Sequence, residues 1–562
     1  MFLHRLASSC RALALVGVAA LVSSESSGLA DPSVPSDLPA IVHALERLTF
    51  GATANDVARA RQMGLASWID GQLRPASIDD AALERRLARF ETLALSSEVL
   101  ARDYFMPARR ERRERAMAAA SNASDSPIEA TPSASASSPE SMPRRVPSEA
   151  QRQQQLVLLE LSQAKVLRAV YSERQLQEVL VDFWFNHFNV FAGKGRTAHY
   201  LTEYEREAIR PHVLGRFRDL LEATAKSPAM LFYLDNWMSS APEGSAAPTA
   251  AGSKARRRTR SAPPPRGGAA DASTARSDQR PPRPRGLNEN YARELLELHT
   301  LGVDGGYTQG DIADVARAFT GWTIGRPEAA GFRFAPAMHD AGVKTVLGHR
   351  IAAGGGEEDG ERVLDILASH PATARLLATK LARRFVSDQP PPALVDRVAS
   401  RFLETNGDLR IVVRTLVTSP EFFAASARAA KVKTPLEFAA SALRASGAVV
   451  DNATPVVRAL RELGMPLYLC QPPTGYDAAA ETWVSSGALV SRMNFALDLA
   501  SGRLRGVSVP AGAARLDERR ADLAAALLHG RASRSTLATM AKAESDEQLL
   551  ALTIGSPEFQ RR

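Results

Sequence analysis

The sequence predicts a mainly α-helical fold: one large multi-helical domain with a single small β-hairpin and two disordered low-complexity insertions. Helix-start signals recur along the whole chain. Two of them, Thr53 with Asp56 and Ser172 with Gln175, have the spacing of capping boxes. Strand patterns do not alternate with helix patterns, and no glycine-rich phosphate loop follows a strand. These observations indicate a helical scaffold rather than an alternating α/β fold.

The stretch from Gly286 to Trp322 holds the densest run of helix starts, helix stops and clustered polar side chains. Asn288 can cap a helix whose apolar residues recur at helical spacing and face the core. Gly302 ends that helix. A capping-box pattern at Thr308 then opens a second helix. We therefore expect two consecutive helices here.

Residues 1–30 have the layout of a secretory signal peptide. Basic residues come first, an apolar run from Ala12 to Val22 follows, and small residues precede the end of the segment. The run is far shorter than the roughly 20 residues that span a bilayer. We therefore expect an exported protein, periplasmic or extracellular, with no transmembrane anchor after signal removal and a helical domain over residues 40–560.

Two low-complexity tracts interrupt the helical patterns. Residues 108–155 begin with the basic run ARRERRER and become rich in Ser, Ala and Pro, and residues 239–286 are rich in Pro, Ala, Gly and Arg. Both compositions are typical of disordered insertions, because they cannot bury a core. The second tract carries most of the net charge of +8. We therefore expect no specific nucleic-acid partner, only weak contact between this tract and anionic envelope polymers.

One region favours strands. The segments 332–334 and 344–346 alternate in polarity, and turn-forming residues separate them. We expect these two segments to pair as the β-hairpin.

A first cluster of candidate residues lies on the predicted helix around Asp182. Trp184 and His187 fall on an aromatic line of this helix, and Asp182 falls on a polar line. A histidine among aromatic rings can serve as a metal or haem ligand or as a general base. The alternative is a core histidine bonded to a carbonyl.

A second cluster, Asn288, Asn290, Glu294 and Glu297, lies on the central helix. Its oxygens could bind a cation or serve as paired carboxylates. The alternative is a structural network in which Asn288 is only a cap. The Glu-x-x-His spacing of di-iron bundles is absent.

A third cluster, His339, Asp340 and Lys344, lies at the tip of the expected hairpin. It could bind an anion or transfer protons, with Trp322 beside it. The alternative is a turn aspartate with exposed neighbours. The sequence lacks the motifs of serine hydrolases, zincins and paired-cysteine zinc sites. Cys470 is either a nucleophile or a small buried side chain.

Five stretches of the sequence resemble one known family. They are NENYARELLELHTLGV with YTQGDIADVARAFTGW in the central region, HALERLTFGAT at His43, FWFNHFNV at Phe183, MLFYLDN at Met230 and HDAGVKTVLG at His339. Together they resemble the bacterial family called domain of unknown function 1800. The resemblance extends over nearly all of the chain after residue 40. It implies an exported, mostly helical protein and no established activity.

Two functional classes therefore stay open. The first is an enzyme, hydrolytic or metal-assisted, acting on an envelope or extracellular substrate. Its candidate catalytic residues are Asp182, His187, Glu294 and His339. Its candidate binding residues are Trp184, Asn288, Asn290, Glu297, Trp322, Asp340 and Lys344. The second is a non-catalytic secreted binding or assembly protein whose polar clusters are structural. The sequence indicates no particular cofactor, metal or partner protein.

For the enzyme, we expect the three clusters to approach one another in one cleft. Buried ionisable groups without partners would cost several kcal/mol, so clustering satisfies them in either class.

We expect cleavage of the signal peptide near Ala30, because small residues follow the apolar run there. N-terminal sequencing of the exported protein measures the cleavage site. An intact Met1 on protein retained in the cytoplasm would contradict this expectation.

Overall fold

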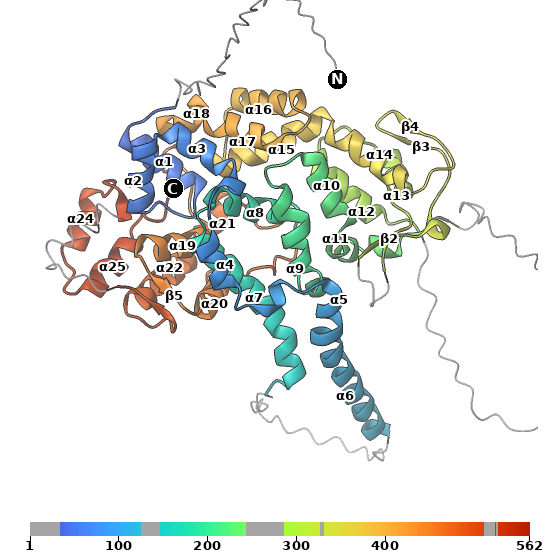
Figure 1. The fold of residues 1–562 in the computed structure, drawn as a ribbon, viewed down its shortest axis with the longest axis horizontal. Coiled ribbons are helices and arrows are strands. Elements are labelled where there is room, and N and C mark those ends of the chain that lie inside the picture. Colours follow the sequence, from blue (N-terminus) through green and yellow to red (C-terminus); the bar gives the residue numbers. More distant parts are fainter. Residues whose placement is uncertain (1–33, 125–145, 243–285, 326–330, 511–522, 524–526) are drawn as a thin grey trace, which may run out of the picture.

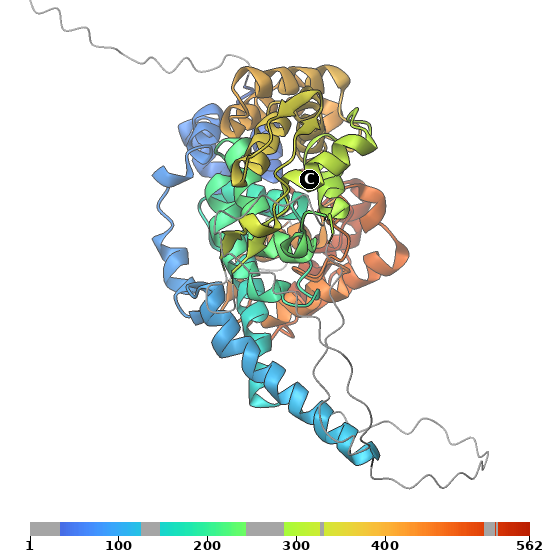
Figure 2. The same cartoon turned by 90° about the vertical axis from the view of Figure 1, so that its right-hand side faces the viewer.

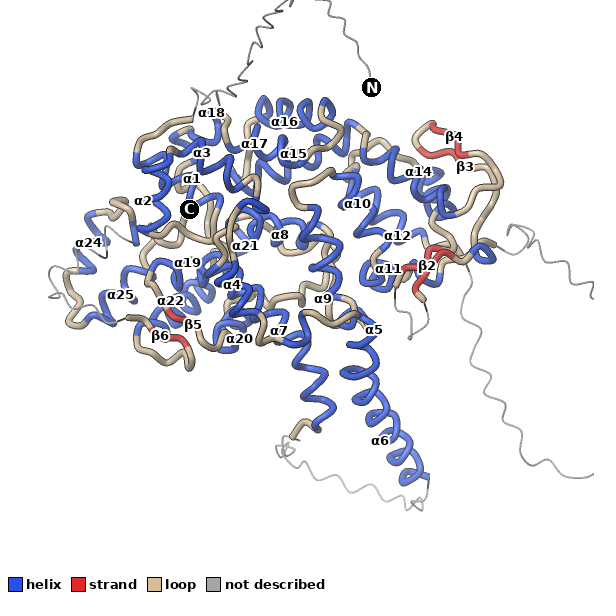
Figure 3. The backbone as a smooth tube through the Cα atoms, in the orientation of Figure 1, coloured by secondary structure: helices blue, strands red, loops and turns tan. Residues whose placement is uncertain are grey.

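The computed structural model describes residues 34–124, 146–242, 286–325, 331–510, 523 and 527–562. The signal peptide predicted for residues 1–30 lies outside the described residues, and so does most of the basic tract at 239–286. Helices dominate the described part of the chain (Figures 1 and 3), which confirms the predicted fold class. None of the described helices is long and apolar enough to cross a membrane.

The elements follow one another with short connections in most of the described chain. The N-terminal helices are α1 (Leu38–Leu48), α2 (Ala54–Met63), α3 (Leu65–Gln72), α4 (Ala81–Leu87), α5 (Ser97–Val99) and α6 (Met106–Ser124). The next are α7 (Glu149–Tyr171), α8 (Gln175–His187), α9 (Leu201–Glu203), α10 (Phe217–Lys226), α11 (Pro228–Tyr233), α12 (Glu289–Glu294) and α13 (Gln309–Ala318).

The second half of the chain is also helical. Its first helices are α14 (Glu357–Ala368), α15 (Pro371–Phe385), α16 (Pro392–Glu404), α17 (Leu409–Val417) and α18 (Pro420–Phe423). The last are α19 (Pro435–Ala445), α20 (Thr454–Glu462), α21 (Ala480–Trp483), α22 (Ser486–Ala500), α24 (Arg534–Met540) and α25 (Asp546–Ile554).

Three further segments of the described chain are π-helical, namely η3 (Leu100–Phe105), η5 (Tyr204–Ile209) and η8 (Leu295–Thr300).

Side-chain caps fix the starts of many helices. Thr53 caps α2 and Thr308 caps α13, each in a full capping box, as the sequence predicts. The capping box predicted for Ser172 and Gln175 is wrong. The Ser172 hydroxyl donates to Asp80 Oδ2 at 2.7 Å and accepts from the Arg174 amide at 3.0 Å, not from the Gln175 amide. Helix α8 begins after Arg174 without a side-chain cap, and the Gln175 side chain accepts from the distant Phe50 amide at 2.9 Å.

The strands of the described residues form three two-stranded antiparallel sheets. They are β1 (Trp322–Ile324) with β2 (Phe332–Phe334), β3 (Lys344–Val346) with β4 (His349–Ile351), and β5 (Val449–Val450) with β6 (Val507–Ser508).

The two predicted strands are present as β2 and β3, but their predicted pairing with each other is wrong. Each pairs with a strand closer to it along the chain. Leu347 and Gly348, with φ of 49° and 79°, form the two-residue turn between β3 and β4. Figure 3 shows both of these sheets at one edge of the helical body.

The segment 108–155, predicted as a disordered insertion, is helical at both ends. Helix α6 covers its first part, α7 begins near its end, and residues 125–145 lie outside the described residues. Ser148 caps α7 in a box with Gln151, and its hydroxyl donates to Glu111 of α6. The two helices lie side by side and project from the body of the molecule (Figures 1 and 2).

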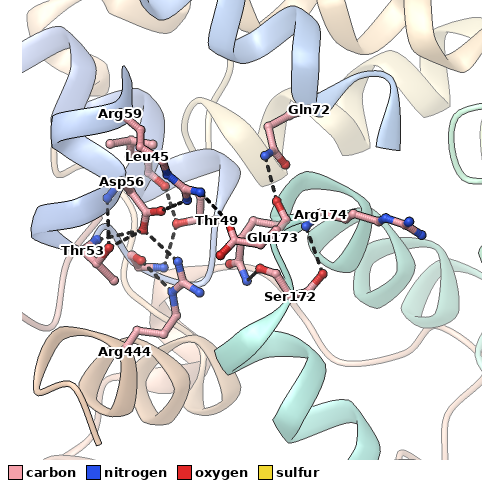
Figure 4. Close-up of polar contacts among 12 residues, drawn as sticks. Leu45, Thr49, Thr53, Asp56, Arg59, Gln72, Ser172, Glu173, Arg174 and Arg444 are labelled. Atoms are coloured by element: carbon pink, nitrogen blue, oxygen red, sulfur yellow. Dashed lines mark hydrogen bonds and ion pairs between the residues drawn. The ribbon is translucent and has the colours of Figure 1, made fainter. Parts of the chain in front are cut away.

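A network of charges joins α2, the junction between α7 and α8, and α19 (Figure 4). Arg444 Nη2 lies 2.9 Å from Asp56 Oδ2, and Arg444 Nε donates to the Gly51 carbonyl at 2.9 Å. Arg59 lies 2.7 Å from Asp56 and 2.6 Å from Glu173. Asp56 and Arg444 have only 7% of each side chain exposed, so this pair anchors three distant segments inside the protein.

We expect Asp56→Asn to lower the free energy of unfolding by about 3–5 kcal/mol, because it leaves Arg444 buried without its counter-charge. Burial raises the pKa of Asp56, but Arg444 and hydrogen bonds from Thr53 and Arg59 hold this pKa below its usual value. The stabilisation is therefore complete above the usual Asp pKa and is lost as the pH falls through the lower folded-state pKa. Denaturant unfolding between pH 7 and pH 2 measures both effects.

Asp396→Asn is the matched control. Asp396 pairs with Arg375 at 2.6 Å, but more than half of each side chain is exposed. We expect this change to cost less than about 1 kcal/mol. Equal losses in the two variants would contradict the role assigned to Asp56.

Candidate functional site

Asp182 lies in a second buried network of charges, between α7, α8 and η5. Lys165 Nζ lies 2.8 Å from Asp182 Oδ1 and 5.3 Å from the centre of the Tyr468 ring. Arg210 of the same network lies 3.3 Å from Glu205, and the Tyr468 hydroxyl donates to Glu205 at 2.6 Å. Burial lowers the pKa of Lys165, but Asp182 and Glu205 outweigh burial and hold this pKa above its usual value.

The space beside Asp182 is small. Two cavities border this network, with volumes of about 20 and 10 Å³. Such a volume admits roughly one water molecule. The network therefore fits the structural alternative for Asp182 better than a substrate site.

His187 lies fully inside the protein, at the end of α8. Its Nε2 lies 3.1 Å from the carbonyl of His299, and its Nδ1 lies 3.1 Å from Nζ of Lys380. Because a carbonyl only accepts, Nε2 carries the proton and Nδ1 accepts from Lys380. Trp184 packs edge-on against the His187 ring at 5.3 Å. Burial, then Lys380, holds the pKa of His187 well below its usual range, so this histidine is neutral.

The residues of the central helix have separate roles. Asn288 caps α12 by accepting from the Tyr291 amide at 3.1 Å, and its Nδ2 donates to the Leu234 carbonyl at 2.6 Å. Asn290 is exposed. Glu294 lies close to Glu297, and burial together with this second carboxylate raises the pKa of Glu294.

The third cluster is buried, unlike the exposed turn that was one alternative for it. His339 Nδ1 donates to the Thr320 carbonyl at 2.8 Å, and its Nε2 lies 3.1 Å from Asp359. Lys344 Nζ lies 2.6 Å from the same Asp359, and Arg317 holds Asp340 through two contacts of 2.9 and 3.1 Å. The Lys344–Asp359 pair joins β3 to α14, and the Arg317–Asp340 pair joins α13 to the loop before β3.

Trp322 is also fully buried. A side-chain carbon at Gly360 would lie 2.5 Å from its ring, so the ring packs directly on the α14 backbone. Trp322 therefore forms part of the core beside the third cluster.

The first cluster contacts the segment that carries the second cluster, but not its predicted members. His187 bonds to the carbonyl of His299 in η8, which follows α12. Among the described residues, the hydrogen bonds and ion pairs of Asp182, His187 and His339 do not join one of these three to another. Their catalytic assignment stays a prediction. No group of three or more His, Cys, Asp or Glu side chains in the described ranges could hold a metal ion.

A larger cavity, of about 480 Å³, lies where α6 and α7 meet the loop before α9. We call it the arginine cavity. Its polar lining residues are Arg109, Arg112, Gln154, Arg196, His199 and Tyr200, and its rings also include Phe105 and Phe232. The volume falls in the range of about 300–1,000 Å³ that is common for ligand pockets.

The arginine cavity has a positive charge that the described side chains do not neutralise. In the described part of the chain, Arg109, Arg112 and Arg196 form no ion pair with a carboxylate, and Arg112 donates only to Gln154 Oε1, at 3.4 Å. Burial, followed by repulsion from Arg196 and Arg109, lowers the pKa of His199 to about 4. His199 is therefore neutral, and its ring packs on Phe105 with the ring centres 4.0 Å apart.

The sequence pattern does not predict this cavity, because the run ARRERRER has the composition of a disordered insertion. The available signal was the spacing of Arg109 and Arg112, which places both side chains on one face of a helix. Arg196 lies more than 80 positions further along the sequence, so no local pattern connects it to the other two.

Comparison with known proteins assigns the chain to a family. The model of the family described as "Protein of unknown function (DUF1800)" matches residues 43–561. The chain belongs to the DUF1800 family. No curated protein and no solved structure matches it. The DUF1800 match includes every residue that lines the arginine cavity.

We expect Glu294→Gln to raise the free energy of unfolding at pH 7 by a few tenths of a kcal/mol, roughly the size of a like-charge pair on a helix. The change removes repulsion from Glu297. Because the folded-state pKa of Glu294 is raised, ionisation destabilises the fold, and the gain should disappear below the usual Glu pKa. Unfolding curves at pH 7 and pH 3.5 measure this difference.

Glu289→Gln is the control, since Glu289 lies on the same helix as Glu294 and is exposed. Its carboxylate accepts from Gln309 of α13 at 2.9 Å. We expect no gain from that change. A loss of stability in Glu294→Gln at pH 7 would instead show that ionised Glu294 has a stabilising partner.

Proposed function

We propose that this DUF1800 protein is an exported binding protein, and that its arginine cavity takes an anionic ligand with an apolar or ring-shaped part. The observation that carries the proposal is the group of Arg109, Arg112 and Arg196 around one cavity, without carboxylate partners among the described residues. Arginine binds planar oxyanions such as carboxylate and phosphate through two parallel hydrogen bonds.

The rings of the cavity support a ligand that is not merely an ion. Phe105, Tyr200 and Phe232 lie on its walls, and Phe232 stacks on Trp237 with the ring centres 5.7 Å apart. Such rings bury apolar surface and favour stacked partners. An oxyanion attached to a ring or acyl group therefore matches the lining better than a bare ion does.

The contacts of the predicted catalytic residues favour binding over catalysis. Asp182 pairs with Lys165, and His187 is a neutral histidine bonded to a backbone carbonyl. His339 bonds to a carbonyl and to Asp359. These contacts resemble those of structural networks, so the binding alternative from the sequence analysis is the better supported one.

The proposed export rests on the N-terminal sequence. A basic start, an apolar run and small residues are typical of a signal peptide. In the envelope or outside the cell, an anionic glycan, lipid or acidic metabolite would supply both the oxyanion and the apolar part.

The proposal predicts that phenyl phosphate binds more tightly than inorganic phosphate, and that benzyl alcohol binds weakly. The first probe satisfies both the arginines and the rings, whereas each of the others satisfies only one of them. Arg109→Gln/Arg112→Gln should weaken phenyl phosphate about a hundredfold or more, since charge-assisted hydrogen bonds contribute roughly 1.5–3 kcal/mol each. Isothermal titration calorimetry at two salt concentrations measures the affinities, and binding should weaken with salt.

Arg110→Gln/Arg113→Gln is the matched control. These arginines lie on the same helix with the same spacing and are exposed, but they do not line the cavity. We expect wild-type affinity from this variant. Equal weakening in both double variants would mean that the helix attracts anions only by its overall charge, and it would overturn the proposal.

A further inference from the structure

A separate cavity, of about 310 Å³, is lined by residues of α1 and by Arg562. We call it the Arg562 cavity. Figure 1 shows the C-terminal end of the chain beside α1. Its charged and imidazole lining residues are His43, Glu46, Arg428, His529, Arg531 and Arg562. Leu38, Pro39 and Val42 of α1 form an apolar wall. It shares no lining residue with the arginine cavity.

Basic side chains outnumber carboxylates around the Arg562 cavity. Three arginines line it (Arg428, Arg531 and Arg562), and the carboxylate in its lining is that of Glu46. Arg562 also pairs with Glu437, which lies behind the lining. A charge with too few counter-charges beside it is costly where water is excluded. The lining therefore favours a negative ligand.

Polar atoms without partners lie at this cavity. Arg562 is only 3% exposed, and its Nε has no hydrogen-bond partner among the described residues. His529 has 7% of its side chain exposed, and its Nε2 is likewise unpartnered, 3.9 Å from Glu46. Nη2 of Arg531 has no hydrogen bond in the described structure and lies 3.4 Å from the same carboxylate.

Backbone pairing holds Arg562 in place. Its amide donates to the Lys431 carbonyl at 2.9 Å, and the Lys431 amide donates back at 3.3 Å. Arg562 Nη2 lies 3.0 Å from Glu437 and 3.2 Å from the Arg384 carbonyl. One edge of the guanidinium is thus fixed by the protein, while Nε stays unpartnered. Such preorganisation lowers the entropy cost of binding.

Two basic groups that line the cavity have lowered pKa values. Burial first, then Arg47 and Arg428, lowers the pKa of His43 to about 3. Burial first, then repulsion from Arg384, lowers the pKa of Arg562 to about 10. Burial alone lowers the pKa of a base, and the neighbouring arginines act in the same direction.

We infer that the Arg562 cavity binds a phosphate group, with Arg531 and Arg562 on its oxygens. A dianion balances a lining in which three arginines lie around the single carboxylate of Glu46. The volume exceeds that of a phosphate ion, and the apolar wall of α1 leaves room for a small alcohol portion. A phosphate monoester is therefore the ligand class, and free phosphate is its minimal form.

The test uses the full chain in the Arg109→Gln/Arg112→Gln background, so that the arginine cavity does not contribute to the signal. Inorganic phosphate and glycerol phosphate are titrated by calorimetry and by thermal unfolding, with sodium chloride at matched ionic strength as the reference. We expect both phosphates to bind and to raise the melting temperature above the chloride reference. Tighter binding of glycerol phosphate would identify an ester as the ligand, and equal binding would identify the free ion.

Arg531→Gln removes one contact from a side chain that is 28% exposed, so the variant should fold. We expect it to weaken phosphate about tenfold. Arg534→Gln is the control, because Arg534 is exposed, lies three residues away and does not line the cavity. It should bind as the parent does. Phosphate that stabilises no more than chloride, or equal affinities in these two variants, would overturn the inference. Neither outcome depends on whether the arginine cavity binds phenyl phosphate.

Discussion

A charged side chain that leaves water requires an opposite charge or hydrogen bonds beside it, and this requirement determines where the helices of the chain meet. Asp56 and Arg444 connect α2 to α19, although they lie 388 positions apart in the sequence. Lys165 and Asp182 connect α7 to α8. Lys344 and Asp359 connect β3 to α14. The first two pairs join one helix to another, and the third joins a strand to a helix. Each pair adds a directional contact to the apolar packing at its junction.

Among the described residues, two cavities are lined by more basic side chains than carboxylates, and these are the places where we assign ligands. In the arginine cavity, Arg109 and Arg112 are exposed, so water screens their charges. At the Arg562 cavity, Arg562 is buried and its charge is screened less. A ligand that binds only the folded chain stabilises it at either site, to an extent set by its affinity and concentration.

The parts of the fold that depend on neighbouring residues could be predicted from the sequence. The capping boxes at Thr53 and Thr308, the cap at Asn288 and the strand character of 332–334 each depend on a few adjacent positions. The capping box at Ser172 failed because the Gln175 side chain accepts from the amide of Phe50, 125 positions away, instead of the amide of Ser172.

The candidate sites could be predicted far less well, because their partners are distant in the sequence. The aromatic line around His187 is visible in the sequence, but Lys380, which donates to it, lies 193 positions away. Composition also predicts disorder in a segment that is helical. A basic run followed by a Ser/Pro-rich stretch is typical of disorder, but its first part forms α6, which carries two arginines of a cavity.

Two π-helical segments affect the directions of the side chains in α6 and of the backbone carbonyl beside His187. A π-turn includes one more residue than an α-turn, so it changes the direction of every side chain that follows. Segment η3 leads directly into α6, and its Ala101 and Phe105 line the arginine cavity. It therefore sets the rotation of α6, and with it the direction of Arg109 and Arg112. Segment η8 carries His299, whose carbonyl accepts from His187. Segment η3 thus lies next to the arginine cavity, and segment η8 lies next to the buried His187. These two departures from α-helical geometry occur beside the polar groups discussed above.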